Sequence, residues 1–203
     1  MKHPLWRTAV FAAALLPPAC WLYQAAGAAL GPDPGKALLD RLGQGGLVLL
    51  LLTLGLTPLQ RASRWNGWAA VRRQLGLWCF AYASAHLACY LLFILGLEFA
   101  RLGAELRQRP YVLVGALAWC LLLALALTSN RASMRRLGRR WKSLHRLAYV
   151  ALVLVLLHML WVVRADLGRW LLYAAWALLL GVVRLPALSR RRGGRGGRGR
   201  AAD

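Results

Sequence analysis

The sequence comprises 203 residues, of which 60% are hydrophobic, and its 27 basic and six acidic residues give a formal net charge of +21. A soluble domain is closer to half apolar, so this composition excludes an ordinary soluble protein and indicates an integral membrane protein. The charge alone would suggest nucleic-acid binding, but its distribution along the chain argues against that function.

Long apolar segments account for the composition. A membrane-spanning helix needs about 20 predominantly apolar residues, and six segments of the chain meet or approach this requirement. They lie at about 8–30, 44–60, 75–97, 111–129, 144–163 and 168–185. Six spans and their loops use almost the whole chain, so we expect an all-α bundle of six transmembrane helices. In the loop before the second span, residues 31–43, we expect a short amphipathic helix that lies on the membrane surface.

The basic residues predict the orientation of the bundle. With the N-terminus in the cytoplasm, 20 of the 27 lysines and arginines fall before span 1, between spans 2 and 3, between spans 4 and 5, or after span 6, counting Arg146 and Arg184 at the cytoplasmic ends of spans 5 and 6. Five of the six acidic residues fall in the other three loops. Because cytoplasmic loops carry an excess of Lys and Arg, both termini are predicted to be cytoplasmic.

The sequence divides into a membrane domain at 1–186 and a basic tail at 187–203 that is rich in arginine and glycine. We expect the tail to be disordered and to contact anionic lipid. The chain has no internal repeat that stands out and no glycine-rich dinucleotide loop. Any pyridine-nucleotide electron source must therefore be a separate protein.

Three histidines lie within the helical regions, and their depths in the membrane can be compared. His86 is 13 residues after Arg73, near the cytoplasmic start of its helix, and His158 is 13 residues after His145. At 1.5 Å per residue both separations are about 20 Å, so His86 and His158 are expected at matching depth toward the outer face. Such a pair suits the two axial ligands of a haem iron. A lone membrane histidine also serves as a hydrogen-bonding group between helices, and that alternative stays open for each residue.

The cytoplasmic ends of the same two helices, here called the inner level, carry different residues. His145 is expected level with Arg72 and Arg73, and an arginine fork suits a phosphate or a haem propionate. These residues therefore form a candidate site for an anionic redox cofactor such as a flavin phosphate. The alternative is that both arginines only fix the topology. No residue has the pattern of a catalytic acid, base or nucleophile.

Two segments resemble the ferric-reductase-like transmembrane family. They are RRQLGLWCFAYASAHLACY at 72–90 and TSNRASMRRLGRRWKSLHRLAYVALVLVLLHMLW at 128–161. The second is the more specific, because it combines TS, the pattern RRLG-x-x-W-x-x-LHRL-x-Y and a later H-x-x-W. The similarity in hydropathy extends over residues 1–185.

The resemblance implies a haem b subunit of the bacterial inner membrane that passes electrons to a periplasmic molybdopterin-containing methionine sulfoxide reductase of the MsrP type. That partner would perform the catalysis and repair oxidised periplasmic proteins. Respiratory quinones or a cytosolic flavin reductase are the implied donors, and FMN is an implied cofactor.

The resemblance also implies roles for individual residues. His86, His145 and His158 match the motif histidines, and Arg72 and Arg73 match an arginine pair proposed near the flavin. The wider family has two histidines on each of two helices, which bind two stacked haems. This chain has arginine at one of those positions, so His145 is expected to contact either a second haem or another cofactor.

Other functions fit parts of the pattern. A ferric or quinone reductase acting without MsrP would have the same haem site. A proton-coupled transporter would use His and Arg, although the absence of an acidic residue within a predicted span disfavours it. A structural assembly subunit would need no cofactor.

Overall fold

A computed structural model describes residues 3–27, 29–163 and 167–193, with side chains through Arg184. Every regular element in these ranges is helical. The elements are α1 (Pro4–Ala26), α2 (Pro34–Ser63), α3 (Gly67–Cys89), the π-helix η1 (Tyr90–Ile94), the 3₁₀-helix η2 (Phe99–Arg101), α4 (Leu102–Gln108), α5 (Pro110–Leu127), α6 (Arg131–Leu137), α7 (Arg139–Leu144), α8 (Leu147–Val162) and α9 (Leu167–Gly193). Six helical segments in the described ranges are long and apolar enough to cross a membrane. The predicted fold class is therefore confirmed, and the chain is a multi-pass membrane protein.

The second span differs most from its predicted bounds. α2 begins at Pro34 and runs for 30 residues. The Asp33 carboxylate accepts a hydrogen bond of 2.9 Å from the Lys36 N–H, and Pro34 occupies the first helical turn, where its missing N–H costs nothing. The separate surface helix predicted within 31–43 is therefore wrong, because this cap starts the spanning helix itself.

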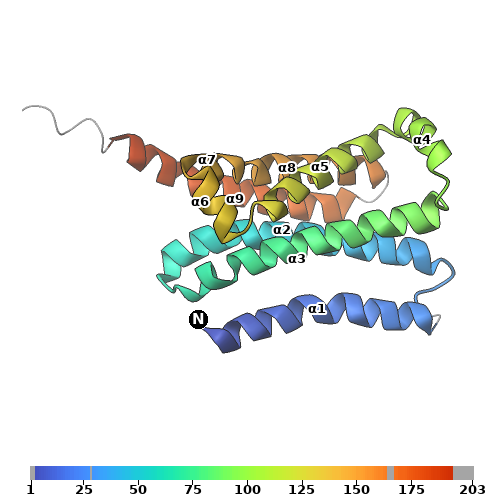
Figure 1. The fold of residues 1–203 in the computed structure, drawn as a ribbon, viewed down its shortest axis with the longest axis horizontal. Coiled ribbons are helices and arrows are strands. Elements are labelled where there is room, and N and C mark those ends of the chain that lie inside the picture. Colours follow the sequence, from blue (N-terminus) through green and yellow to red (C-terminus); the bar gives the residue numbers. More distant parts are fainter. Residues whose placement is uncertain (1–2, 28, 164–166, 194–203) are drawn as a thin grey trace, which may run out of the picture.

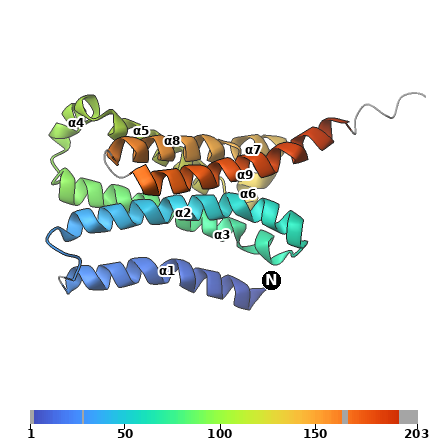
Figure 2. The ribbon, with the colours of Figure 1, turned by 180° about the vertical axis from the view of Figure 1, so that it is seen from behind.

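The helices form three layers (Figure 1). α2 and α3 pack along their lengths as an antiparallel pair in the middle, and α1 lies along one side of this pair. α5 and α8 form a second antiparallel pair on the other side, and α9 contacts both α2 and α8. Figure 2 shows α9 from behind, running alongside α2. The start of α1 and the end of α9 lie at the same end of the bundle.

Small residues allow close approach within both helix pairs. In the first pair the Cys79 thiol donates a 3.4 Å hydrogen bond to the Gly46 carbonyl. In the second pair Ala118 and Ala151 are only 2% and 0% exposed. In membranes, small side chains at helix interfaces let the backbones approach and increase van der Waals contact. Both helix pairs are therefore closely packed where these small residues meet.

α9 ends beyond the predicted domain boundary. The helix continues to Gly193, whereas the sequence divides the domain from its tail at 187. Residues 194–203, which include most of the predicted disordered tail, lie outside the described ranges. The division into domain and tail therefore stays a prediction.

Candidate functional site

His86 on α3 and His158 on α8 face each other across the two helix pairs. Their ring centroids are 6.2 Å apart and their planes are nearly perpendicular, at 89°. Two metal–imidazole bonds of about 2 Å each separate the ligand nitrogens by about 4 Å, taking the length known for zinc. Each centroid lies a further ring radius away, so the observed separation fits a single metal ion between the two imidazoles. The structure thus brings together the two histidines expected at matching depth.

Both imidazoles are oriented by the backbone of a neighbouring helix. His86 Nδ1 donates a 2.8 Å hydrogen bond to the Leu39 carbonyl on α2, and His158 Nδ1 donates a 2.7 Å bond to the Tyr111 carbonyl on α5. A carbonyl only accepts, so Nδ1 carries the proton in each ring. That tautomer leaves Nε2 unprotonated, with a lone pair available to a metal. No hydrogen bond to either Nε2 is found among the described residues.

Each imidazole rests against a glycine. A Cβ added to Gly43 on α2 would lie 2.9 Å from His86 Nδ1, and a Cβ added to Gly115 on α5 would lie 2.9 Å from His158 Nδ1. Any larger residue would therefore push the ring out of its position. The two glycines form the space in which the rings lie, and the donor set with this space fits an axially ligated haem.

The two histidine sites are equivalent positions of a structural repeat. Leu39 and Tyr111, Gly43 and Gly115, and His86 and His158 each differ by 72 positions. The same offset relates Gly46 to Ala118 and Cys79 to Ala151, the small residues within the two pairs. The expectation that the chain has no internal repeat is therefore wrong at the level of structure. The repeat escapes detection in the sequence because few residue types are shared between the halves.

His145 lies in a different environment. Its ring stacks on Trp141 with centroids 3.9 Å apart and an angle of 28°. Its Nε2 is 3.3 Å from the Ser129 hydroxyl, and its Nδ1 is 3.2 Å from the Trp141 carbonyl. Both ring nitrogens therefore lie within hydrogen-bonding distance of protein oxygens, unlike those of His86 and His158. In this arrangement His145 has no nitrogen aimed at an open position.

Arg72 and Arg73 do not act as a pair in the structure. Arg72 is partly buried and donates a 2.8 Å hydrogen bond from Nη2 to the Gln60 side chain on α2. Arg73, one residue later, is exposed. The hydrogen-bond and stacking partners of His145 in the described ranges include neither arginine. In the repeat, Arg73 occupies the position equivalent to His145.

Comparison with known proteins agrees with these observations. The model of the family described as ferric reductase like transmembrane component matches residues 42–156, more than half of the chain. The protein-methionine-sulfoxide reductase heme-binding subunit MsrQ of Cronobacter sakazakii is 44% identical over 182 residues, which cover 88% of this chain and 90% of the relative.

The chain belongs to the MsrQ group of the ferric-reductase-like transmembrane family. The family predicted from the motifs is thus confirmed. The stretch matched by the ferric reductase model contains Gly43, His86, Gly115 and His145, and it ends two residues before His158.

Sequence reasoning missed the groups that orient the histidines. Gly43 precedes His86 by 43 positions, and Gly115 precedes His158 by the same number. This matched spacing was a usable signal, but single glycines are common in membrane helices. The carbonyl oxygens of Leu39 and Tyr111 had no signal at all, since every residue has a carbonyl.

Proposed function

We propose that this chain is a haem b electron-transfer subunit of the bacterial inner membrane, with His86 and His158 as the axial ligands. The observation that supports it best is the imidazole pair, because the two ring centroids are 6.2 Å apart and each Nδ1 donates to a carbonyl, which leaves both Nε2 atoms unprotonated. The name of the Cronobacter relative, a heme-binding subunit, supports the same cofactor. When bound, haem supplies a one-electron redox couple whose potential depends on the axial ligands and their surroundings.

The residues of the chain would tune and protect this cofactor. The hydrogen bonds from Nδ1 to Leu39 and Tyr111 increase the electron density that each imidazole donates. Ligation by two histidines leaves no open coordination position, which favours electron transfer over oxygen binding. Trp119 donates a 3.1 Å hydrogen bond to Ser84 and so ties α5 to α3 on the helix that carries His86.

The proposed direction is from the cytoplasm to the periplasm. The positive-inside rule, together with the two described ends at one side of the bundle, supports cytoplasmic termini. His86 and His158 would then lie toward the periplasmic face, close to a pocket lined by residues that include Arg109, Tyr111 and Trp161. This pocket is a reasonable contact region for the periplasmic partner, since Tyr111 itself bonds His158.

The proposed partner is a periplasmic MsrP-type molybdopterin reductase, which would reduce methionine sulfoxide in oxidised periplasmic proteins. Quinones or a cytosolic flavin reductase would supply the electrons. Family resemblance supports Arg72 and Arg73 as contacts of an FMN phosphate or a haem propionate, with His145 as a further cofactor contact. The different surroundings of the two arginines favour separate contacts over one shared anion.

Substitution of single histidines tests the axial pair. His86→Ala and His158→Ala should each abolish the b-type band in a reduced-minus-oxidised visible spectrum of the purified protein, because each removes an iron ligand. His145→Ala should retain most of the band, and His3→Ala, near the N-terminus, should retain all of it. Equal loss in His86→Ala, His158→Ala and His145→Ala would contradict the assignment, as would a wild-type protein without a b-type band.

The glycines offer a test that leaves every ligand in place. Gly43→Ala and Gly115→Ala should each lower haem affinity about tenfold or more, since displacing a packed ring costs about 1–3 kcal/mol. Gly55→Ala on α2 is a matched control, because its added Cβ would make only an ordinary 3.7 Å contact with Leu180. Haem retention during dilution measures the effect, and wild-type retention in both Gly43→Ala and Gly115→Ala would refute the steric role of the two glycines.

Electron delivery separates the proposed function from a ferric or quinone reductase that acts alone. Reduced wild-type protein mixed with an oxidised MsrP-type reductase and methionine sulfoxide should be reoxidised, with one methionine formed per two electrons. His86→Ala should give no transfer. If the wild-type protein holds haem but reduces only ferric chelates or quinones, the proposed partner is wrong while the haem site stands.

A further inference from the structure

Three arginines from distant parts of the sequence gather at the end of the bundle that carries the start of α1. They are Arg61 on α2, Arg72 on α3 and Arg184 on α9, and together we term them the arginine seam. Arg72 bonds the side chain of Gln60, which is next to Arg61 in α2, and Arg184 bonds the Leu54 carbonyl six residues before Gln60, so the three side chains lie along one short stretch of α2. Arg72 and Arg184 are partly buried, whereas Arg61 is exposed.

A proline in α2 explains the inward position of Arg184. Pro58 has no N–H, so the carbonyl of Leu54, four residues earlier, loses its helical donor. Arg184 Nη2 donates a hydrogen bond to this carbonyl. Its guanidinium also lies 5.1 Å from the ring centroid of Tyr149 on α8. These contacts fix the arginine between α2 and α8 and stop it from extending freely into water.

The seam has hydrogen-bond donors without acceptors. The Nε atoms of Arg72 and Arg184 are both buried and both lack a partner. Within the described ranges, Arg72 donates to one acceptor, the Gln60 amide oxygen, and Arg184 donates to one acceptor, the Leu54 carbonyl. A buried donor that lacks an acceptor loses its hydration without compensation, and the loss is greater for a charged group, so the arrangement favours an additional acceptor.

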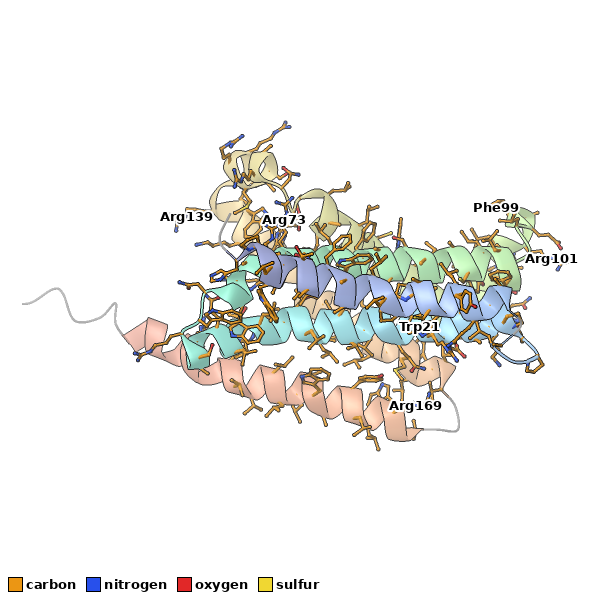
Figure 3. The ribbon with its side chains drawn as sticks, turned by 90° about the horizontal axis from the view of Figure 1, so that it is seen from below. Trp21, Arg73, Phe99, Arg101, Arg139 and Arg169 are labelled. Carbon is orange, nitrogen blue, oxygen red and sulfur yellow. The ribbon has the colours of Figure 1, made fainter. Side chains whose placement is uncertain are left out.

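No carboxylate in the described ranges neutralises the seam. The two ion pairs found there, Arg101–Glu98 and Arg109–Glu105, belong to the loop around α4. Figure 1 shows α4 at the end of the bundle opposite to the start of α1, and Figure 3 shows Arg101 at the opposite end from Arg73 and Arg139. The described part of the chain thus supplies neither a further acceptor nor a negative charge, and an anionic ligand would supply both.

We propose that the arginine seam binds the phosphate group of one anionic phospholipid. Arginine forks suit phosphate oxygens in both geometry and charge. The preceding turn of α9 is apolar and open, with Val182 and Val183 52% and 49% exposed, so acyl chains would lie beside the seam. Under the proposed orientation this level is the cytoplasmic headgroup region, where anionic lipid attracts basic residues. The site depends on the membrane topology and not on haem.

Phosphate from a soluble source, such as a flavin nucleotide, has the same chemistry, and the experiment must distinguish the two. Native mass spectrometry of the full-length protein in detergent would measure one-to-one binding of phosphatidylglycerol, phosphatidylcholine, FMN and inorganic phosphate. We expect phosphatidylglycerol to bind at least tenfold more tightly than phosphatidylcholine. Arg72→Gln and Arg184→Gln should each weaken phosphatidylglycerol binding about tenfold, the value expected for one charged hydrogen bond.

Arg139→Gln is the matched control, because Arg139 is exposed near the same end of the bundle as Arg73. It should change lipid affinity less than twofold. Arg72→Gln keeps the bond between Arg184 and Leu54, so it separates loss of the ligand from loosening of α9. Equal binding of the two lipids, or equal weakening by Arg139→Gln, would overturn the proposal. Loss of FMN binding in both seam variants with unchanged lipid binding would overturn the lipid assignment and identify a soluble phosphate ligand.

The haem spectrum, read on the same samples, distinguishes failure of this site from failure of the proposed function. Arg184→Gln, whose side chain contacts Leu54 and Tyr149 and has no proposed role in cofactor binding, is expected to bind wild-type amounts of haem.

Discussion

The hydrogen bond from an imidazole Nδ1 to a helix carbonyl is the interaction on which the candidate site depends. It occurs twice, at His86 with Leu39 and at His158 with Tyr111. A helix carbonyl has two lone pairs, so it accepts this bond while it keeps its place in the helix. The bond selects one tautomer and fixes one ring orientation, and the glycine four residues further along the helix supplies the space. Without that glycine the carbonyl would be out of reach, because the imidazole would be displaced.

The repeat shows where the two halves of the bundle agree and where they differ. At the outer level the histidine, the carbonyl and the glycine are equivalent in both halves. At the inner level Arg73 stands where the other half has His145. His145 is stacked on Trp141 and lies near Ser129. It directly follows α7, and the short helices α6 and α7 connect α5 to α8 in the second helix pair. The structure thus combines one symmetrical histidine level with one unsymmetrical level, which accords with one bis-histidine haem.

Much of this architecture follows from the sequence because the bilayer makes strong demands. Apolar length gives the six spans, and the helical rise places His86 and His158 at one depth. The start of α2 was missed because the cap by Asp33 and Pro34 outweighed the polar composition of the first turns. The partners of the histidines and of Arg184 were missed for another reason. The contacts with Leu39, Tyr111 and Leu54 are made to backbone carbonyls. Such contacts depend on how the helices pack, and the residue type at these positions does not indicate them. The free carbonyl of Leu54 did have a signal in Pro58, but only packing reveals that Arg184 occupies it.

The electron paramagnetic resonance spectrum of the oxidised, purified protein tests the central claim most directly. Two imidazoles with planes near 89° should give a ferric haem that is low-spin and highly anisotropic, with a single large principal g value. That signal would support one iron ligated by both histidines in nearly perpendicular planes. A high-spin ferric signal would mean that an axial position is open or weakly held, and it would contradict the account, as would a low-spin rhombic signal typical of parallel imidazole planes.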